Sequence, residues 1–253
     1  MNPEFLIGSA RNRGDMADSA GGGPDIAIVV PHTGTVSMRW AIALATLDMP
    51  HHHIVTKSTA AIDLARELTV EDALDTNPEW LLFLDSDVIP PQDVFGRLRR
   101  HNKPVVSGLY YVDGDVVHPA VWMLDENDSP SAVEVDDSSL IYEQDGSASR
   151  LEPGADGLMT VDAIGFGCVL IHTSVFQEVE RPWFRWTKGY DEHPWDLRHQ
   201  EGTTGISEDF YFCHKLAEAG YDVHLDTSVR CAHEKGCLLT DDGVFLESQL
   251  SHD

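Results

Sequence analysis

The stretch EWLLFLDSDVIPPQD, residues 79–93, joins a continuous apolar run to two carboxylates and then to a pair of prolines. A short apolar run of this kind is typical of a strand buried on both faces, and such strands belong to parallel sheets that helices cover on both sides. Asp85 and Asp87 then follow at the carboxyl end of the strand, which is where α/β sheets bind their ligands. The stretch therefore predicts the class of fold and the place of the site together.

The same alternation of strands and helices extends to both sides of this stretch. We expect strands at 25–31, 52–56, 80–85 and 104–110, and helices at 36–47, 58–76 and 91–101. Further on we expect strands and a short helix within 158–179, a helix at 207–220 between the cap Ser207 and Gly220, and a last strand at 221–233. In the helix at 58–76, we expect Ser58 or Thr59 as the cap and an apolar face of Ala61, Leu64, Ala65, Leu68 and Ala73. This order predicts an α/β fold with a mostly parallel, doubly wound sheet and helices on both faces.

The length of 253 residues suits one domain with a sizeable core. We expect that domain at 25–240, between a flexible N-terminal segment at 1–24 and a C-terminal tail at 241–253. Residues 125–157 are rich in Asp, Glu, Ser, Gly and Pro, so we interpret them as an acidic surface insertion that includes a hairpin rather than as a domain boundary.

The charge of the chain limits its partners. The 43 acidic and 17 basic residues give a net charge of −26, which repels nucleic acid and anionic membranes over most of the surface. Asp exceeds Glu and Arg exceeds Lys, a balance that resembles halophilic proteins. No apolar segment reaches the length of a membrane span, and the four cysteines form no CxxC pair. We therefore expect a cytoplasmic protein, with a peripheral position at the membrane surface left open.

Asp85 and Asp87 have a chemistry that fits a cation. Two carboxylates separated by one small residue at a strand end suit a hard divalent cation, which prefers oxygen ligands and bridges the oxygens of a diphosphate. Solvated loop acids are the plain alternative, because such spacings are common in so acidic a chain. The buried strand directly before the pair favours the metal site.

Five motifs in order resemble the family 2-type glycosyltransferases of the GT-A fold, within the nucleotide-diphospho-sugar transferase superfamily. They are LLFLDSDVIPP at 81–91, SGLYY at 107–111, AIGFGCVLI at 163–171, SEDFYFCHKLAEAGY at 207–221 and DTSVRCAH at 226–233. The resemblance covers about 25–233 and implies an enzyme of the hexosyltransferase type that uses a UDP- or GDP-linked sugar. It also implies a nucleotide-sugar half at about 25–115 and an acceptor half at about 158–240. Asp85, Asp87 and His233 would then bind Mn²⁺ or Mg²⁺ with the diphosphate of the donor.

The resemblance extends to the rest of the donor site. Pro31, His32, Thr33 and Gly34 match the turn that cradles the nucleotide, with Ser86 beside them, although an ordinary turn capped by Thr33 explains the same residues. Arg66 matches an arginine that pairs with a phosphate or orients an aspartate. Glu67 departs from the asparagine that the family has next, and a solvated helix arginine remains the alternative.

Glu208 and Asp209 match the Glu-Asp pair of the family. Asp209 would be the base that takes the proton of the acceptor hydroxyl, and Glu208 would orient the acceptor or the backbone. Their alternative is the ordinary preference for acids in the first turn of a helix. We expect the acceptor, which would be a glycan, a glycoprotein or a lipid-linked molecule, at Gly165, Phe166 and Gly167 and at the aromatic residues Trp183, Trp186, Tyr190 and Trp195.

Two other classes of protein compete with this interpretation. A haloacid-dehalogenase-like phosphatase would use Asp85 as nucleophile and Asp87 as acid and base, but it expects a Gly-Thr-like continuation where this chain has Val88 and Ile89. A non-catalytic nucleotide or glycan binder would keep the sheet and lose the metal site. We assign no role to the three consecutive histidines at 51–53, whose side chains alternate in direction, or to Cys231 and Cys237.

Overall fold

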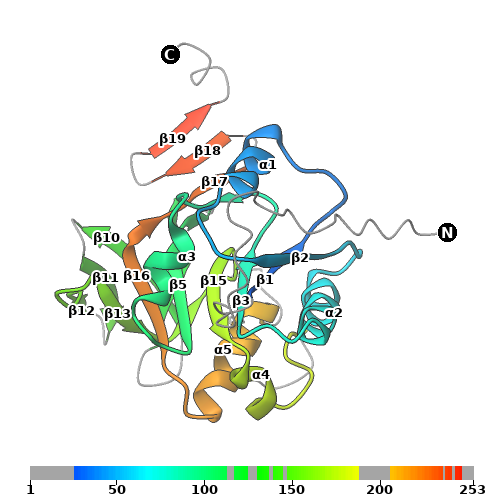
Figure 1. Cartoon of the computed structure of the whole chain (residues 1–253). Coiled ribbons are helices and arrows are strands. Elements are labelled where there is room, and N and C mark those ends of the chain that lie inside the picture. Colours follow the sequence, from blue (N-terminus) through cyan, green and yellow to red (C-terminus); the bar gives the residue numbers. More distant parts are fainter. Residues whose placement is uncertain are drawn as a thin grey trace.

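The computed structural model describes residues 26–112, 117–124, 130–136, 139–144, 147–187, 206–235, 237–240 and 243–246. The expected segment at 1–24 and the aromatic residues Tyr190 and Trp195 lie outside the described residues. A central sheet with helices on both faces dominates the fold (Figure 1).

The central sheet has seven strands in the order β13-β16-β5-β15-β3-β1-β2. Their bounds are β1 Ile26–Pro31, β2 His52–Lys57, β3 Trp80–Leu84, β5 Val105–Leu109, β13 Leu158–Val161, β15 Cys168–His172 and β16 Val223–Arg230. Five of the seven run in one direction, while β15 and β13 run against their neighbours. The mostly parallel sheet is confirmed, and the sequence did not indicate that an antiparallel strand, β15, would lie between β3 and β5.

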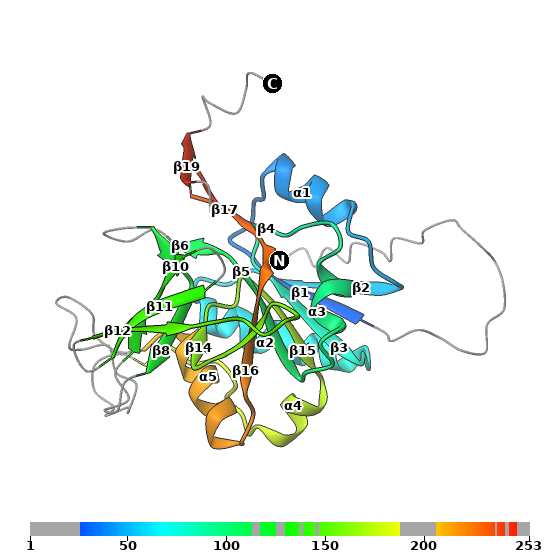
Figure 2. The same cartoon turned by 90° about the vertical axis from the view of Figure 1, so that its left-hand side faces the viewer.

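Alternating residues of the strands form two cores, one on each face of the sheet. The helices that cover them in the described part of the chain are α1 Met38–Ala45, α2 Ile62–Asp75, α3 Val94–Arg99, α4 Ser174–Glu178 and α5 Glu208–Glu218. On one face Leu81 and Phe83 pack with residues of α2, α4 and α5, and on the other Leu82 and Leu84 pack with residues of α1 and α3. Figure 2 shows α1 above the sheet and α4 and α5 below it. The predicted helices on both faces are confirmed.

Helix α2 begins later than predicted, and its buried face matches the expected one only in part, since Ala65 and Ala73 are buried as predicted. Its N-cap is Ala61, not Ser58 or Thr59, and Leu64 of the expected apolar face is exposed. The buried face also carries Arg66, Glu67 and Thr69 beside apolar residues. The helix lies against polar groups at the edge of the sheet, so tertiary contacts override the apolar pattern. The cap Ser207 and the end of α5 near Gly220, which has φ of +80°, are as predicted.

Short strands surround the main sheet in four smaller sheets. Their bounds are β4 Val88–Ile89, β6 Tyr111–Val112, β7 His118–Pro119, β8 Val121–Leu124, β9 Pro130–Ala132, β10 Glu134–Asp136, β11 Ser139–Gln144, β12 Ser147–Leu151, β14 Ala163–Ile164, β17 Ala232–Glu234, β18 Cys237–Thr240 and β19 Gly243–Leu246. The expected insertion contains the hairpin of β11 and β12. Strand β19 pairs with β18, so the expected boundary at 240 divides a hairpin.

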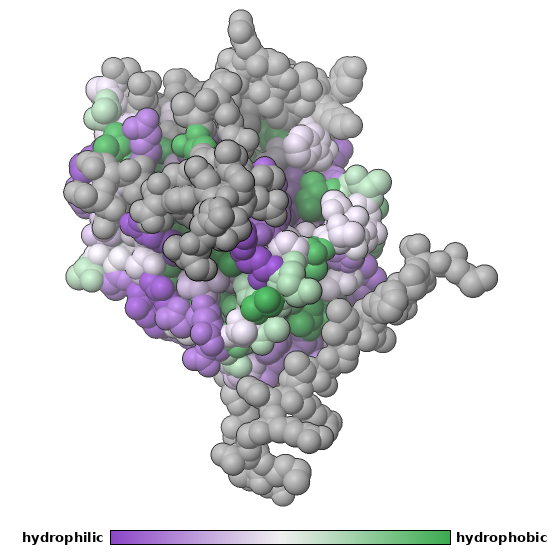
Figure 3. All heavy atoms as spheres, turned by 90° about the horizontal axis from the view of Figure 1, so that it is seen from above, coloured by the Kyte–Doolittle hydropathy of each residue, from purple (hydrophilic) through white to green (hydrophobic). Residues whose placement is uncertain are grey.

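The surface beside the first strand-to-helix loop is partly apolar. Val36, Met38 and Ile42 are exposed at the start and along one side of α1. Figure 3 views the molecule from above, the side on which α1 lies in Figure 1, and shows apolar atoms among polar ones there. No helix in the described part of the chain is long and apolar enough to cross a membrane.

Candidate active site

The predicted site residues come together because the strands end at one edge of the sheet. Strands β1, β3, β5 and β16 are parallel, so their carboxyl ends share this edge, and antiparallel β15 begins there. The backbone N–H of Asp85, directly after β3, donates to the carbonyl of Gly167, directly before β15, at 3.0 Å. This bond fixes the Asp-Ser-Asp turn against the Gly-Phe-Gly turn. Helices α2 and α5 bring in Arg66 and the Glu208-Asp209 pair from one face.

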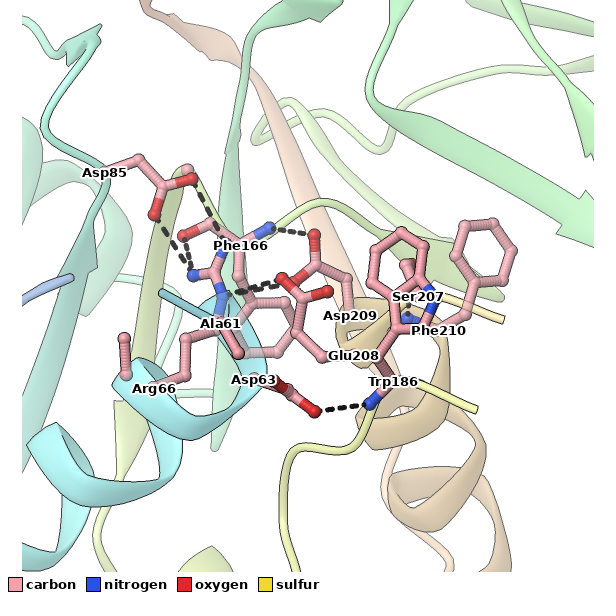
Figure 4. A network of polar contacts seen from close by, with 12 residues as sticks. Ala61, Asp63, Arg66, Asp85, Phe166, Trp186, Ser207, Glu208, Asp209 and Phe210 are labelled. Atoms are coloured by element: carbon pink, nitrogen blue, oxygen red, sulfur yellow. Dashed lines mark hydrogen bonds and ion pairs between the residues drawn. The ribbon is translucent and has the colours of Figure 1, made fainter. Parts of the chain in front are cut away.

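Arg66 is the centre of a buried polar network (Figure 4). Its side chain is 3% exposed, and its Nε donates to Glu208 Oε1 at 3.1 Å while its Nη2 donates to Asp85 Oδ2 at 3.2 Å. Its Nη1 donates to the carbonyl of Phe166 at 3.3 Å. The Nε also lies 3.4 Å from Asp209 Oδ1. One guanidinium therefore holds carboxylates from the end of β3 and from the first turn of α5.

The network carries more negative than positive charge. Asp85, Glu208 and Asp209 face a single guanidinium, and Oδ1 of Asp85 and Oδ1 of Asp209 are buried without a hydrogen bond from any residue that the structure describes. Burial raises the pKa of Asp209 well above its ordinary value, an effect that Arg66 opposes and that Glu208 and Asp85 reinforce. Burial likewise raises the pKa of Asp85, again against the attraction of Arg66. Because these two oxygens share one guanidinium, each keeps lone pairs that can accept a hydrogen bond from a ligand.

The guanidinium of Arg66 remains protonated. Burial alone would lower the pKa of the guanidinium, but the neighbouring carboxylates of Asp209, Asp85 and Glu208 raise it above its ordinary value. Arg66 therefore stays charged at every pH at which the protein is folded.

Asp87 and His233 form a second cluster beside the first. His233 Nε2 lies 3.4 Å from Asp87 Oδ2, and His233 Nδ1 lies 2.6 Å from the carbonyl of Tyr111. The contact of Nδ1 with a carbonyl fixes the orientation of the ring and turns Nε2 toward Asp87, as such contacts do in metal-binding histidines. Lys235 Nζ lies 2.6 Å from the same oxygen of Asp87. Burial would raise the pKa of Asp87, but its hydrogen bonds to His233 and Lys235 lower it to about 2.

The structure does not bring the three expected metal ligands together. The carboxylate of Asp85 turns to Arg66, whereas Asp87 and His233 face each other. Among the described residues no set of three His, Cys, Asp or Glu side chains lies close enough to hold a metal ion. Asp87 and His233 still fit a divalent cation as two ligands, since one offers an oxygen and the other a nitrogen fixed by Tyr111.

The expected nucleotide turn lies at the same edge of the sheet. Pro31 ends β1, and the backbone N–H of Gly34 donates to His32 Nδ1 at 2.9 Å. Gly34 has φ of +114°, a conformation that favours glycine, and Thr33 and Gly34 are exposed. Thr33 does not cap α1, because Ser37 does: its Oγ accepts from the backbone N–H of Trp40 at 2.9 Å. An exposed turn at this edge leaves its backbone open to a ligand.

The Gly-Phe-Gly turn makes room for a side chain. A Cβ on Gly165 would come within 1.9 Å of the Tyr110 hydroxyl, and one on Gly167 within 2.8 Å of the Tyr110 ring. The hydroxyl accepts from the backbone N–H of Gly167 at 3.3 Å. Phe166 is fully buried, but its backbone N–H donates to Asp209 Oδ2 at 3.3 Å. The turn thus positions Asp209, and Tyr110 packs against both glycines.

Tyr110 is a site residue that the sequence motifs did not single out. Its buried hydroxyl has a pKa well above the ordinary value because of burial and the nearby charges of Asp209 and Asp85. Its ring packs edge-on against His233, with 5.4 Å between ring centroids. Tyr110 therefore packs against His233 of the second cluster and lies near the charges of the first. The motif SGLYY, one of the five, could have indicated this role, because its first tyrosine directly follows a strand that ends at the ligand edge of the sheet.

Of the four aromatic residues expected to contact the acceptor, the structure describes Trp183 and Trp186, which have different surroundings. Trp183 is 6% exposed and packs on Phe176 in the core, so the expectation that it contacts an acceptor is not met. Trp186 is 44% exposed, and its backbone N–H donates to Asp63 Oδ2 at 3.0 Å. Glu67, the departure from the family pattern, accepts from the backbone N–H groups of Trp183 at 2.8 Å and Phe184 at 3.0 Å. It anchors this segment to α2.

Comparison with known proteins supports the fold. No protein family model matches the sequence. Among solved structures, A197 from STIV is 18% identical with a TM-score of 0.57, and the match covers 88% of this chain and 94% of that one. The structure of GalNAc-T7 with UDP, GalNAc and Mn²⁺ is 11% identical with a TM-score of 0.50, over 83% of this chain and 43% of that one. At these identities the comparisons show that the chain has a GT-A-like fold.

Proposed function

We propose that this protein is a glycosyltransferase that moves a sugar from a nucleotide-diphosphate sugar to an acceptor hydroxyl, in the manner of family 2. The observation that carries the proposal is the single guanidinium of Arg66 between Asp85 and the Glu208-Asp209 pair. It joins the end of the strand that would hold the donor to the acid that would activate the acceptor. The GT-A-like fold adds support, since GalNAc-T7, solved with UDP, GalNAc and Mn²⁺, shares it.

The donor would lie along the carboxyl edge of β1 and β3. Pro31, His32, Thr33, Gly34 and Ser86 would contact the nucleotide. Oδ1 of Asp85, which lies 3.1 Å from Arg66 Nη1, would also accept a hydrogen bond from the ribose. Asp87 and His233 would hold Mn²⁺ or Mg²⁺, which when bound neutralises charge on the departing diphosphate. Asp85 would then act through hydrogen bonding and through Arg66 rather than as a ligand.

Asp209 would be the base for the acceptor. One oxygen accepts from the backbone N–H of Phe166, and the other is buried with no hydrogen-bond donor, although Arg66 Nε lies 3.4 Å away. An acceptor hydroxyl would supply that donor and pass its proton to the carboxylate as it attacks the sugar. The raised pKa of Asp209 makes the carboxylate a stronger base than an ordinary aspartate. Glu208 would hold Arg66 in place, and exposed Trp186 would contact the acceptor.

The phosphatase alternative needs Asp85 as a nucleophile. Its carboxylate instead pairs with Arg66 through both oxygens, and the strand before it belongs to a GT-A-like sheet. The non-catalytic binder has no observation of its own. Oδ1 of Asp209 is buried without a hydrogen bond from the described residues, which argues for a reacting group. A glycan, a protein or a lipid-linked molecule would each suit the proposal as acceptor.

A thermal-shift panel tests the donor site. UDP, GDP and CDP and their sugars would be added with and without Mn²⁺, at high salt, to the wild type, to Asp87→Asn and to Asp209→Asn. We expect one nucleotide to stabilise the wild type and Asp209→Asn but not Asp87→Asn. Hydrolysis or transfer of the matching sugar should then require Asp209. A folded protein that no nucleotide stabilises would refute the proposal.

A further inference from the structure

The residues after β16 place a lysine at the expected cation site. Strand β17 pairs with β4, with His233 opposite Val88, and the backbone N–H of Glu234 donates to the carbonyl of Asp87 at 2.8 Å. Successive side chains of an extended chain alternate in direction. His233 and Lys235 therefore both reach Asp87, whereas Glu234 points the other way, to Ser37 Oγ at 2.5 Å and Arg39 Nη1 at 3.1 Å.

The ammonium of Lys235 lies where a divalent cation would bind Asp87. Its Nζ is 2.6 Å from Asp87 Oδ2, the oxygen that also faces His233 Nε2 at 3.4 Å. A cation that took both ligands would have to come within a few ångströms of the ammonium. Two like charges that share one carboxylate repel each other, and half-exposed Lys235 has a flexible stem on which its charge can move away.

We propose that Lys235 is a built-in cation of the donor site, which competes with a divalent metal for Asp87 and pairs with the diphosphate of the donor. The second half of this inference rests on the proposed function, and the first half does not. In the free protein Lys235 neutralises Asp87. When a nucleotide diphosphate binds, the ammonium turns to the phosphate oxygens, which carry more charge than one carboxylate, and Asp87 becomes available to the metal.

Binding of Mn²⁺ alone tests the competition without any activity measurement. We expect Lys235→Met to bind Mn²⁺ about tenfold more tightly than the wild type by titration calorimetry or by the spin resonance of free Mn²⁺, because the competing charge is gone. The matched control is Lys57→Met, which removes a lysine from another 2.6 Å ion pair, with Asp72. It should bind Mn²⁺ as the wild type does. Equal affinity in Lys235→Met and the wild type would overturn the competition.

Binding of UDP and GDP in excess chelator tests the diphosphate contact. The wild type should keep measurable affinity for its nucleotide without metal, Lys235→Met should lose at least tenfold, and Mn²⁺ should restore most of that loss. Thermal melts of both variants confirm that they are folded. If Lys235→Met binds the nucleotide in chelator as the wild type does, the diphosphate contact is wrong. If neither nucleotide binds in any condition while the Mn²⁺ affinities differ, the proposed function fails and the competition stands.

Discussion

Asp85 and Asp209 lie on two sides of one guanidinium. Arg66 Nη1 is 3.1 Å from Asp85 Oδ1, and Arg66 Nε is 3.4 Å from Asp209 Oδ1 (Figure 4). Asp85 follows β3, and Asp209 lies in the first turn of α5. In the proposed reaction Asp85 would contact the donor and Asp209 would activate the acceptor. Their common partner makes the geometry of the donor half depend on that of the acceptor half, so one substitution should affect both.

Removing that partner should therefore unfold or loosen the site. Arg66→Met leaves Asp85, Glu208 and Asp209 buried without a counter-charge, and breaking a buried pair of this kind costs about 3–5 kcal/mol. Urea denaturation measures the loss of stability. Arg66→Lys should lose less, because an ammonium pairs with one carboxylate but lacks the planar fork. A variant Arg66→Met as stable as the wild type would show that the network contributes little.

We expect the ionised carboxylate of Asp209 to destabilise the folded protein at neutral pH. Its folded-state pKa is raised by burial, so the folded protein holds the proton more tightly than the unfolded chain does. The contribution of Asp209 to the free energy of unfolding is therefore fully present below the ordinary aspartate pKa. It is lost as the pH rises through the raised pKa of the folded state. Asp209→Asn should accordingly raise the melting temperature at pH 7 and leave it unchanged near pH 3. Asp72→Asn, at an exposed ion pair, is the control and should change neither. A lower melting temperature for Asp209→Asn at pH 7 would contradict the assignment.

The same shift sets the pH dependence of transfer. A base must be ionised, so kcat/KM should fall on the acid side with an apparent pKa above the ordinary aspartate value, as the raised pKa of Asp209 requires. The Asp87 carboxyl, with a pKa of about 2, stays ionised throughout that range and should not contribute to the limb. A rate profile measured from pH 4 to 9 decides the point. An acid limb that stays at the ordinary aspartate pKa would mean that another group is the base.

Much of the site follows from the sequence because each of its acids ends or begins an element. Asp85 follows an apolar strand, and Glu208 and Asp209 follow a helix cap, so local signals place them at the same edge of the sheet. The contact of Lys235 with Asp87 and the place of antiparallel β15 depend on strand pairing between distant segments, which local pattern does not specify. Trp183, expected at the acceptor, lies in the core, because aromatic composition does not distinguish a core residue from an exposed one.

The fit of Tyr110 into the Gly165 turn is another such non-local contact, and a double-mutant cycle measures it. Gly165→Ala would place a Cβ 1.9 Å from the Tyr110 hydroxyl and should cost about 1–3 kcal/mol by overpacking. In a Tyr110→Phe background the cost should fall, since the closest atom is gone. Gly96→Ala, where nothing lies within 4 Å, is the control and should not destabilise the protein. Equal costs in the two backgrounds would show that the turn yields instead of clashing.

Asp226 should be a structural acid with the opposite pH signature to Asp209. Its fully buried carboxylate accepts from the backbone N–H of Ser228 at 2.9 Å. It also lies 2.8 Å from His101 Nε2 and 3.2 Å from Arg100 Nη2. These two contacts connect β16 to the residues that follow α3. Burial would raise the pKa of Asp226, but its hydrogen bonds with His101 and Ser228 lower it. The stability that it contributes is therefore present above the ordinary aspartate pKa and is lost as the pH falls through the lowered one. Asp226→Asn should cost about 3 kcal/mol at pH 7 in urea denaturation, and the difference from the wild type should shrink below pH 4. A difference in stability between the wild type and Asp226→Asn that is independent of pH would mean that the shape of the side chain, not its charge, holds β16 to α3.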